Sequence, residues 1–574
     1  MLRQRFQILL IVFITLGIYY PSIFSEFNSL DDEDMINHLM ELESIDLKGL
    51  FFPESGLQYY RPVLYLTFVL DRFLWLCEPS FMHLENLLMH LINTLLVFFI
   101  TKRLIEFHSL KASAYTALVA SILFSIHPLS TEPVNWVSGR TDLMAGLFVF
   151  SSFLALLKGI DKKEGDKVSA VWITVSALFY LLGLLSKESA IGLLPATGLY
   201  LLLKGDRLAS VKKRDKINIF LLYLVVTAFY FLLRHLATGG SDSGLSKAGS
   251  AITSDVLIKL RGIMVATGFY MKKLFVPLPL NFAIVEVKRI PYLILGILSF
   301  IGFMVIIKKR GLSGYLLLFS FSFIIPALPV AVGKMTWTPL AERYLYISTA
   351  GAVIFSVIIL ERYIAKRWIT HLIIAVLLIF SGLVTARRNI LWQDNLSLYE
   401  DTIKKSPDFA AIRNEYAIAL SRASRVEEGL KQFSIASDLS KGSSWQPELN
   451  LLESKFMVNK SAGEKKKAYI SKLDDPKMPR SIILKRIVNL IEAEMMKEKD
   501  QGRIEELVKE EITYLNMLKE IEKDGSYYYR LGQLYLIKKE KEKALDCFKQ
   551  AVVLSPDRYF SSAARKLVNK LESE

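Results

Sequence analysis

The chain has 574 residues, of which 52% are hydrophobic, and this composition excludes an ordinary soluble globular protein. Its formal net charge of +15 is interpreted as a sign of membrane topology, because the basic residues do not gather with aromatic residues in one soluble segment. Nucleic acid is therefore not an expected partner. Two cysteines, Cys77 and Cys547, exclude a disulfide framework and a cysteine-rich metal site.

The chain opens with an apolar run from about Phe6, which has roughly the 20 residues that cross a bilayer. No small-residue cleavage site follows this run, so we expect an uncleaved anchor rather than a signal peptide. Similar segments recur along the first two-thirds of the chain. Together they predict about eleven membrane-spanning helices, the later ones at 84–101, 113–128, 141–157, 169–185, 189–203, 217–234, 291–307, 312–331, 345–360 and 369–386.

The loops between these segments differ in charge, and the positive-inside rule predicts that the basic loops are cytoplasmic. The N-terminus then lies inside the cell, and the C-terminal part lies outside. The basic groups consist of Lys102, Arg103 and Lys111; Lys158, Lys162, Lys163 and Lys167; Lys204, Arg207, Lys212, Lys213, Arg214 and Lys216; Lys308, Lys309 and Arg310; and Arg362, Lys366 and Arg367.

Two further apolar segments carry charges in their middle. Lys272 and Lys273 interrupt 259–280, and Asp71 with Arg72 interrupts 61–77. A charge at the bilayer centre costs about 2.5–3.5 kcal/mol in insertion measurements. We therefore predict an interfacial or re-entrant helix at 259–280, and a segment along the outer surface at 61–77.

Asp31 and Asp32 follow the first predicted span, and either could act as a base toward a hydroxyl or hold a divalent cation against a phosphate. A solvated loop is the alternative for these two residues alone. The predicted topology gathers other charged residues on the same outer face, and such a gathering suggests a functional site. These are Arg61, Glu132, Arg140, Asp142, Lys187, Glu342 and Arg343.

Three patches of this face can be interpreted in two ways. In HPLSTEPVNWVSGRTD, Arg140 either clamps a phosphate through its planar fork of donors or pairs with Asp142. Lys187 either meets a phosphate or extends to lipid headgroups. In TPLAERYLYIS, Arg343 with Tyr344 and Tyr346 suits a pyranose beside an anionic group, or forms an aromatic belt with one anchoring charge.

After about Arg388 the composition becomes polar and helical. Residues 525–556 fit a tetratricopeptide repeat, through Tyr528, Leu531, Gly532, Tyr535, Ala544, Phe548, Ala551 and Pro556. A weaker unit carries Tyr416, Ala417, Leu420, Gly429, Phe433 and Ala436. Degenerate repeats are expected in 445–520, because a stacked helical array needs about three units to bury its faces. The repeats either receive a partner protein or cap the membrane domain.

The motifs in their order resemble the transmembrane and tetratricopeptide-repeat-containing O-mannosyltransferase-like proteins, relatives of the protein O-mannosyltransferases in the GT-C superfamily. The resemblance rests on SLDDEDMI, YRPVLYLTFVLD, FMHLENLLMHLINTLL, HPLSTEPVNWVSGRTDL, LLSKES, AERYLYIS and RRNILWQDNLSLYEDTI. It implies an all-α chain with a GT-C-like polytopic membrane glycosyltransferase domain at 1–388 and an extracytoplasmic helical-repeat domain at 389–574.

The resemblance also implies inverting sugar transfer from a polyprenyl-phosphate donor to a hydroxyl of a protein or glycan acceptor, outside the membrane. Asp31 or Asp32 is then the catalytic carboxylate, without a choice between them. Glu132 and Asp142 are supporting acids, with a divalent metal as an open possibility. Arg61, Arg140, Lys187 and Arg343 match positions for the donor phosphate, and Tyr344 and Tyr346 for the sugar.

The expected location is the cytoplasmic membrane of a bacterium, with membrane lipid as a further partner. Two rival functions remain at this point. A catalytically inert scaffold would recruit extracytoplasmic partners through its repeats, and a lipid-linked sugar flippase or polymerase would carry charges deep within its spans rather than at their ends.

Overall fold

The computed structural model describes residues 2–573 apart from 54–58, 111–114, 162–167, 205, 239–255, 334–337, 441–443, 459–461 and 557. The described residues are mainly helical, and they contain no strand beyond two isolated bridges. Lys111, Lys162, Lys163 and Lys167 of the basic loops lie outside the described residues. The all-α class is thus confirmed.

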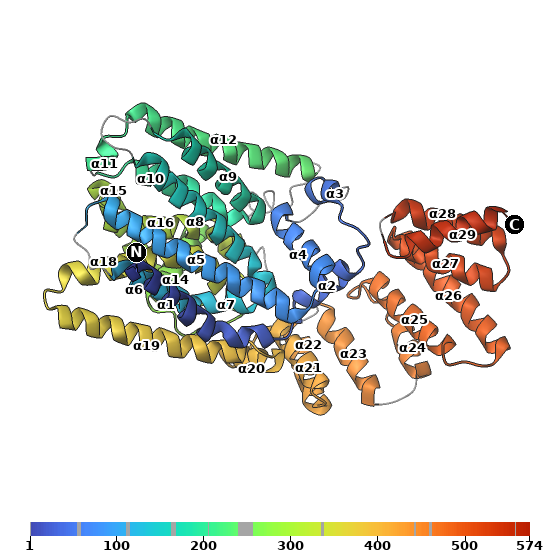
Figure 1. Ribbon diagram of the computed structural model, residues 1–574. Coiled ribbons are helices and arrows are strands. Elements are labelled where there is room, and N and C mark those ends of the chain that lie inside the picture. The colour runs from blue at the N-terminus through green and yellow to red at the C-terminus, as the bar shows by residue number, and fades with distance from the viewer. Residues whose placement is uncertain are drawn as a thin grey trace. The chain divides into compact units, whose positions relative to one another are not determined.

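Contacts divide the chain into two units, which are described separately (Figure 1). The first comprises residues 1–34 and 46–406, and the second comprises 35–45 and 407–574. The predicted boundary after Arg388 falls inside helix α19, Arg367–Leu391. Arg388 itself bonds to Asp401 with a distance of 2.6 Å between Nη1 and Oδ2, within the first unit.

The helices of the first unit are α1 (Leu2–Tyr19), the start of α2 (Asp32–Met40), α3 (Leu47–Phe51), α4 (Pro62–Trp75), α5 (Pro79–Phe107), α6 (Thr116–Ser125), α7 (Thr131–Asn135), α8 (Arg140–Ile160), α9 (Ala170–Ser186), α10 (Leu193–Leu201), α11 (Asp206–Ala209), α12 (Lys213–Ala237), α14 (Val256–Phe275), α15 (Arg289–Lys309), α16 (Leu312–Ile324), α17 (Ala327–Gly333), α18 (Tyr346–Tyr363), α19 and α20 (Asn395–Lys405). Short 3₁₀ turns are η1 (Tyr20–Phe24), η2 (Pro128–Ser130), η3 (Val137–Gly139), η4 (Glu188–Gly192) and η5 (Glu342–Leu345).

Seven helical segments among the described residues are long and apolar enough to cross a membrane, or up to nine if two bent pairs each form one span. Each predicted span corresponds to helical structure in the first unit. The two that fall short are 169–185, which forms the 17-residue α9, and 189–203, which divides into η4 and the nine-residue α10. The chain is an integral membrane protein.

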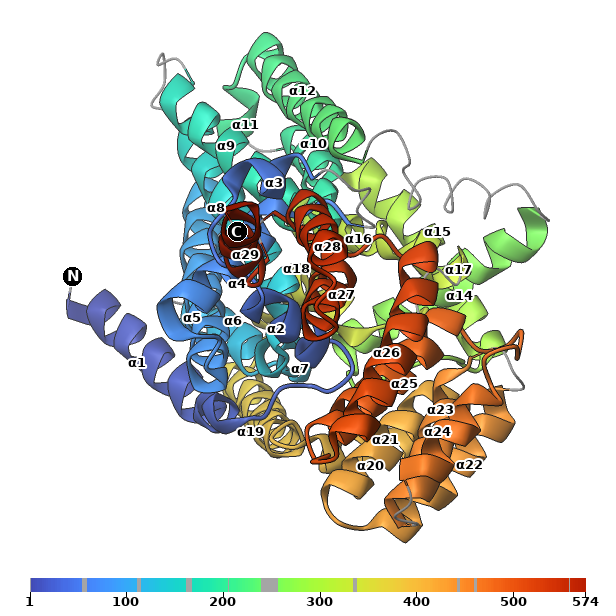
Figure 2. The ribbon, with the colours of Figure 1, turned by 90° about the vertical axis from the view of Figure 1, so that its right-hand side faces the viewer.

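Helix α14 occupies the segment interrupted by Lys272 and Lys273, and it lies beside α15 and α17 (Figure 2). A Cβ at Gly268 would stand 2.0 Å from the carbonyl oxygen of Tyr292, and one at Gly296 would stand 1.9 Å from that of Met264. Gly268 thus meets Tyr292, and Met264, earlier in α14, meets Gly296, later in α15. The two helices therefore pack antiparallel, with their backbones in contact. That α14 is interfacial or re-entrant stays a prediction.

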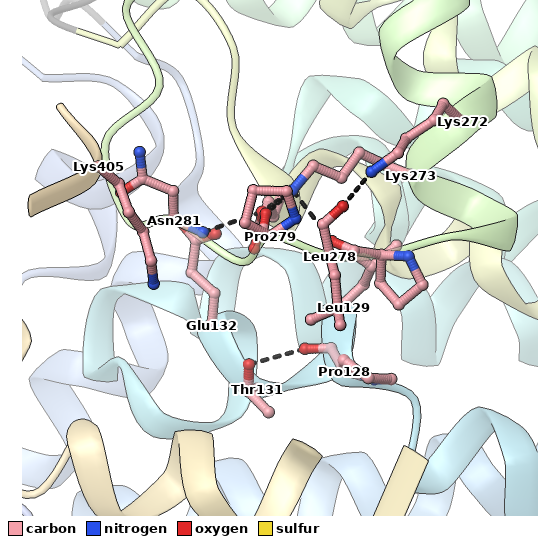
Figure 3. Close-up of polar contacts among 12 residues, drawn as sticks. Pro128, Leu129, Thr131, Glu132, Lys272, Lys273, Leu278, Pro279, Asn281 and Lys405 are labelled. Atoms are coloured by element: carbon pink, nitrogen blue, oxygen red, sulfur yellow. Dashed lines mark hydrogen bonds and ion pairs between the residues drawn. The ribbon is translucent and has the colours of Figure 1, made fainter. Parts of the chain in front are cut away.

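Both lysines near the end of α14 find polar partners in the turn that follows (Figure 3). The Lys272 ammonium donates to the carbonyl of Leu278, and Lys273 donates to those of Pro277, at 3.0 Å, and Pro279. Lys273 also bonds to Glu342 of η5, which accepts the Asn281 backbone N–H at 3.1 Å. This arrangement satisfies charges that lipid would not.

The second unit consists of paired helices in sequence (Figure 1). They are α21 (Ala410–Arg422), α22 (Val426–Ser440), α23 (Gln446–Val458), α24 (Ala462–Ile470), α25 (Arg480–Met495), α26 (Gln501–Ile521), α27 (Gly525–Ile537), α28 (Lys541–Leu554) and α29 (Ser561–Ser573). In the predicted repeat, Gly532 of α27 allows Phe548 of α28 to approach, because a Cβ there would stand 2.6 Å from the ring. The weaker predicted unit forms the pair α21–α22, with Phe433 and Ala436 buried.

Candidate active site

Asp31 and Asp32 are neighbours in sequence with opposite surroundings. Asp32 is fully buried and accepts three hydrogen bonds, from the backbone N–H of Asn28 (3.1 Å), the backbone N–H of Ser138 (3.0 Å) and the Ser138 hydroxyl (2.5 Å). Asp31 is exposed, and no hydrogen bond reaches its carboxylate within the described part of the chain. Asp32 thus joins its loop to η3, while Asp31 presents an open carboxylate.

The pKa values of the two carboxyl groups reflect these surroundings. Burial raises the pKa of Asp32 to about 6, against the lowering effect of its bonds from Ser138 and Asn28. The pKa of Asp31 is also raised, first by partial loss of hydration and further by the charge of Asp34. The positive charge of Arg343 acts on Asp31 in the opposite direction, which places this guanidinium in the electrostatic neighbourhood of Asp31.

Helix α20 holds the loop that carries Asp31. Asn395 accepts the backbone N–H of Ser29 at 3.2 Å and donates to the carbonyl of Phe27 at 2.8 Å. The Tyr399 hydroxyl bonds to the Ser29 hydroxyl at 2.9 Å and donates to the side-chain oxygen of Asn28 at 3.2 Å. The RRNILWQDNLSLYEDTI segment carries part of the family resemblance but no predicted site residue, and it fixes the position of the acidic pair.

Of the predicted phosphate-binding cations, Arg343 is the one that acts on the pKa of Asp31. Its Nη1 donates to Glu132 Oε1 at 2.6 Å, and its backbone N–H donates to the other carboxylate oxygen at 3.1 Å. Its guanidinium carbon lies 4.9 Å from the centre of the Trp136 ring and 5.1 Å from that of Tyr344. One carboxylate and two aromatic faces therefore fix its orientation, while Nε and Nη2 make no hydrogen bond to a described residue.

Lys187 lies at the same edge of the bundle and is bound to Asp142, with 2.6 Å between Nζ and Oδ1. Its ammonium also lies 5.5 Å from the centre of the Tyr344 ring. Burial lowers the pKa of Lys187, and Asp142 opposes that effect. Lys187, Tyr344 and Arg343 thus form a continuous cation–aromatic–cation row.

Arg61 forms a second pair nearby. Its Nε and Nη2 donate to one oxygen of Glu188, at 3.0 and 2.7 Å, and Arg234 donates to the other oxygen at 3.4 Å. The charge of Arg61 acts on Lys187, so the pair belongs to the same charged region. Arg61, Glu188 and Arg234 come from three separate segments of the first unit, which this cluster joins.

Arg140 is placed differently from the other cations. It is fully buried, and all three of its nitrogens are engaged: Nη1 with Asp71 at 2.6 Å, Nε with Asn86 at 3.0 Å and Nη2 with the carbonyl of Met82 at 3.1 Å. The sequence predicts that Arg140 either clamps a phosphate or pairs with Asp142. In the structure Arg140 has no nitrogen left for a phosphate, and Asp142 pairs with Lys187 instead. The partner is Asp71, whose charge interrupts the apolar pattern of 61–77.

The two predicted sugar-binding tyrosines, Tyr344 and Tyr346, differ in burial. Tyr344 is partly exposed beside Arg343 and Lys187. Tyr346 is fully buried in the bundle, where its hydroxyl bonds to His90 at 2.8 Å and accepts from Asn93 at 3.0 Å. Trp136, which the sequence prediction does not assign, provides the second aromatic face of the site.

No group of three His, Cys, Asp or Glu side chains suited to a metal ion occurs within the part of the chain that the structure describes. Glu132 and Asp142, the predicted supporting acids, each bind a cationic side chain.

The tetratricopeptide repeat model matches residues 526–558, the helices α27 and α28. A solved structure with some likeness is the archaeal oligosaccharyltransferase AglB from Archaeoglobus fulgidus, 11% identical, covering 67% of this chain and 55% of that one with a TM-score of 0.37.

Curated relatives match part of the chain. The human protein O-mannosyl-transferase TMTC3 is 29% identical over 197 residues, which is 32% of this chain and 20% of that protein. Human TMTC4, also a protein O-mannosyl-transferase, is 34% identical over 145 residues, or 24% of this chain and 20% of its own length. The matches thus span about a fifth of these relatives. The chain is similar to the TMTC group of protein O-mannosyl-transferases, and the resemblance that its motifs indicate is confirmed.

Proposed function

We propose that this protein is a GT-C type membrane glycosyltransferase that moves a sugar from a polyprenyl-phosphate donor to an acceptor hydroxyl, with inversion at the anomeric carbon. One observation carries the proposal. The exposed carboxylate of Asp31 is influenced by the positive charge of Arg343, and the Nε and Nη2 groups of that guanidinium make no hydrogen bond to a described residue. Mannose is the sugar that the relatives' names suggest. A protein or glycan hydroxyl is the acceptor.

In this mechanism Asp31 is the general base. Its carboxylate takes the proton of the acceptor hydroxyl as that oxygen attacks C1 of the sugar. The new O–C1 bond forms while the bond from C1 to the phosphate oxygen breaks, and its electron pair leaves with the polyprenyl phosphate. The raised pKa of Asp31 suits this role, because a stronger base accepts the proton more readily.

Arg343 is proposed to stabilise the leaving phosphate. Glu132 and the two aromatic rings hold the guanidinium before the reaction, so little reorganisation accompanies the growth of negative charge on the phosphate. Lys187 and Arg61 add positive charge at the same edge, each held by its own carboxylate. Tyr344, which is partly exposed, offers the sugar an aromatic face, and the buried Trp136 supports Arg343 from the other side.

Arg140 and Tyr346 have a different proposed role. Their polar groups are enclosed by Asp71, Asn86, His90 and Asn93, so a donor reaches neither of them without disrupting the bundle. We assign both to the framework that sets the position of the outer loops. Asp32 belongs with them, because its three hydrogen bonds fix the turn that presents Asp31.

The proposed location is the cytoplasmic membrane of a bacterium, with the site on the extracytoplasmic face. The second unit then lies on that same face, where its repeats can receive a protein acceptor. The proposed reaction can be tested by assaying the full chain in nanodiscs. Polyprenyl-phosphate [¹⁴C]mannose is the donor, and a nucleotide-linked mannose is the control donor.

We expect polyprenyl phosphate to be released and label to be transferred only with the lipid-linked donor, and NMR of the product should show the anomeric configuration inverted. Consumption of the nucleotide-linked sugar alone would contradict the donor class. An inert scaffold would consume neither donor while still binding a partner protein.

A further inference from the structure

A cavity of about 590 Å³ opens at the end of the first unit where α5, α15 and α18 finish and α16 begins. Its wall contains three cationic side chains, Lys204, Lys309 and Arg362. Apolar and aromatic residues of α5, α11, α16 and α18 complete the wall, among them Phe107, Leu208, Leu312 and Phe355. Nothing in the proposed reaction uses this cavity.

Among the residues that the structure describes, the three cations have no partner of opposite charge. No carboxylate lies within ion-pair distance of Lys204, Lys309 or Arg362 in the described part of the chain. This differs from the candidate active site, where Arg61, Lys187 and Arg343 each bind an Asp or Glu. Three unpaired charges around one cavity repel one another, and an anion between them would remove that repulsion.

The backbone at the cavity also favours an anion. Gly311, Leu312, Ser313 and Gly314 line it at the start of α16, a helix of 13 residues whose N-cap, Gly311, provides no side-chain cap. The free N–H groups of a helix N-terminus are donors to phosphate oxygens. They add direct hydrogen bonds to the attraction exerted by the three cations.

The apolar part of the wall distinguishes a lipid from a free ion. A second cavity of about 60 Å³ shares Ile306 and Gly311 with the first and is lined by Leu199, Leu202, Leu203 and Leu318. A free phosphate ion has no apolar surface to bury against this wall. The glycerol backbone and first acyl carbons of a phospholipid would cover it. The two cavities are adjacent, since they share two wall residues, and an apolar cavity beside a cationic one favours an amphiphile.

The cavity is distant from the candidate active site. Arg343 and Arg362 lie at opposite ends of η5 and α18, which puts about 30 Å between the two places. That distance matches the hydrocarbon thickness of a bilayer, about 30 Å. The cavity therefore lies at the level of the headgroups of the opposite leaflet, where basic pockets between helices meet anionic lipids.

We propose that this cavity binds the phosphate of an anionic phospholipid, with Lys204, Lys309 and Arg362 around the phosphate and the glycerol region against the apolar wall. The lipid would be a resident of the leaflet opposite the transfer site, distinct from the sugar donor. Phosphate is the chemistry recognised, and the membrane is its source.

Native mass spectrometry of the full chain tests the proposal. Protein released from nanodiscs that contain phosphatidylcholine with 10% phosphatidylglycerol is compared for the wild type, the K204A/K309A/R362A variant and a K213A/K308A/K366A control. The control removes three cations from the basic loops at the same membrane face, and none of these three lines the cavity. Total charge thus changes equally in both variants.

We expect the wild type and the control to retain one phosphatidylglycerol, and the cavity variant to retain at least tenfold less. Equal retention by both variants would overturn the proposal and leave the three cations to topology alone. If the triple variant does not fold, the conservative K204R/K309R/R362K variant and the single R362Q variant serve instead. The conservative variant should retain the lipid, and R362Q should retain about fivefold less.

A second arm separates the two sources of phosphate. The wild type in pure phosphatidylcholine nanodiscs is given 10 mM inorganic phosphate, and its melting temperature is compared with that in nanodiscs containing phosphatidylglycerol. We expect stabilisation only by phosphatidylglycerol, and only in the wild type and the control variant. Equal stabilisation by inorganic phosphate would overturn the assignment to a lipid.

Discussion

Asp31 and Asp32 show how adjacent identical residues acquire different roles. The chain turns into α2 at this point, so the Asp31 side chain faces out while that of Asp32, the next residue, faces the interior and accepts bonds from Ser138. Burial and hydrogen bonding make Asp32 part of the framework. Openness and the field of Arg343 make Asp31 the residue on which the proposed reaction depends.

The pH dependence of transfer reports the surroundings of Asp31. A base must be ionised, so the rate falls on acidification through the pKa of Asp31, which lies above its usual value. Because the charge of Asp34 raises this pKa, D34N should move the acidic limb of the pH–rate profile to lower pH. Because Arg343 lowers it, R343Q should move the limb to higher pH, besides reducing the maximal rate.

The measurement is kcat/KM for the lipid-linked donor between pH 4 and 8. The two substitutions act on the same carboxyl group with opposite sign, so each serves as the control for the other. Limbs that move together, or not at all, would show that Asp31 is not the group that titrates.

At the scale of elements, the site depends on contacts between segments far apart in sequence. Glu132 of α7 orients Arg343 of η5, and Asn395 of α20 holds the loop before α2. The antiparallel pair α14–α15 supports η5 through Lys273 and Glu342. Packing of helices therefore determines which charged side chains meet at the candidate active site.

Glycine at the crossing of α14 and α15 is required for that support. A Cβ at Gly268 would overlap the carbonyl of Tyr292, a backbone atom that moves only with its helix. We expect G268A to lower the free energy of unfolding by about 1–3 kcal/mol, the usual cost of overpacking. Thermal unfolding in nanodiscs measures this.

G302A is the matched control, because a Cβ at Gly302 of the partner helix α15 would meet no atom of a neighbouring segment within 4 Å. It should leave the melting temperature unchanged or slightly raised, since alanine favours helix over glycine. An equal loss of stability in G268A and G302A would contradict close packing at this crossing.

At the scale of the whole molecule, the proposed reaction requires the two ends of the bundle to face opposite sides of the membrane. Residues near the candidate active site face outward on the proposed topology, and the basic loops face the cytoplasm. Asp34 and Lys308 are both exposed and belong to opposite ends of the bundle. They provide a direct comparison.

Cysteines at positions 34 and 308, each introduced after Cys77 and Cys547 are replaced by serine, should react differently with a membrane-impermeant maleimide. In intact spheroplasts we expect D34C to be labelled, and K308C to be labelled only after permeabilisation. The reverse pattern would invert the topology and place the candidate active site in the cytoplasm.

The sequence predicts the spans well, because lipid demands long apolar helices and their pattern is local. It predicts the repeat helices for a similar reason, since Gly532 and Phe548 occupy fixed spacings within one motif. Pairing of the charges is different. Arg140 meets Asp71, 69 positions away, and Arg343 meets Glu132, 211 positions away, which no local pattern indicates.

The direction in which each side chain of a motif points likewise cannot be predicted from the local sequence. Tyr344 and Tyr346 are two residues apart at the junction of η5 and α18, and this change of helix turns one outward and the other into the bundle. Asp31 and Asp32 differ for the same reason. The sequence predicts the segments that carry the candidate site, and the packing determines which of their residues are open and which are enclosed.

Sugar transfer by D31N is the decisive test of Asp31 as the base. Single-turnover transfer from polyprenyl-phosphate mannose is measured at pH 7.5 for the wild type, D31N and D34N, an exposed carboxylate three residues away. Loss of a general base slows a reaction by about 10²–10⁴-fold, so we predict a loss in that range for D31N and less than about threefold for D34N. Transfer by folded D31N at the wild-type rate would contradict the proposed mechanism.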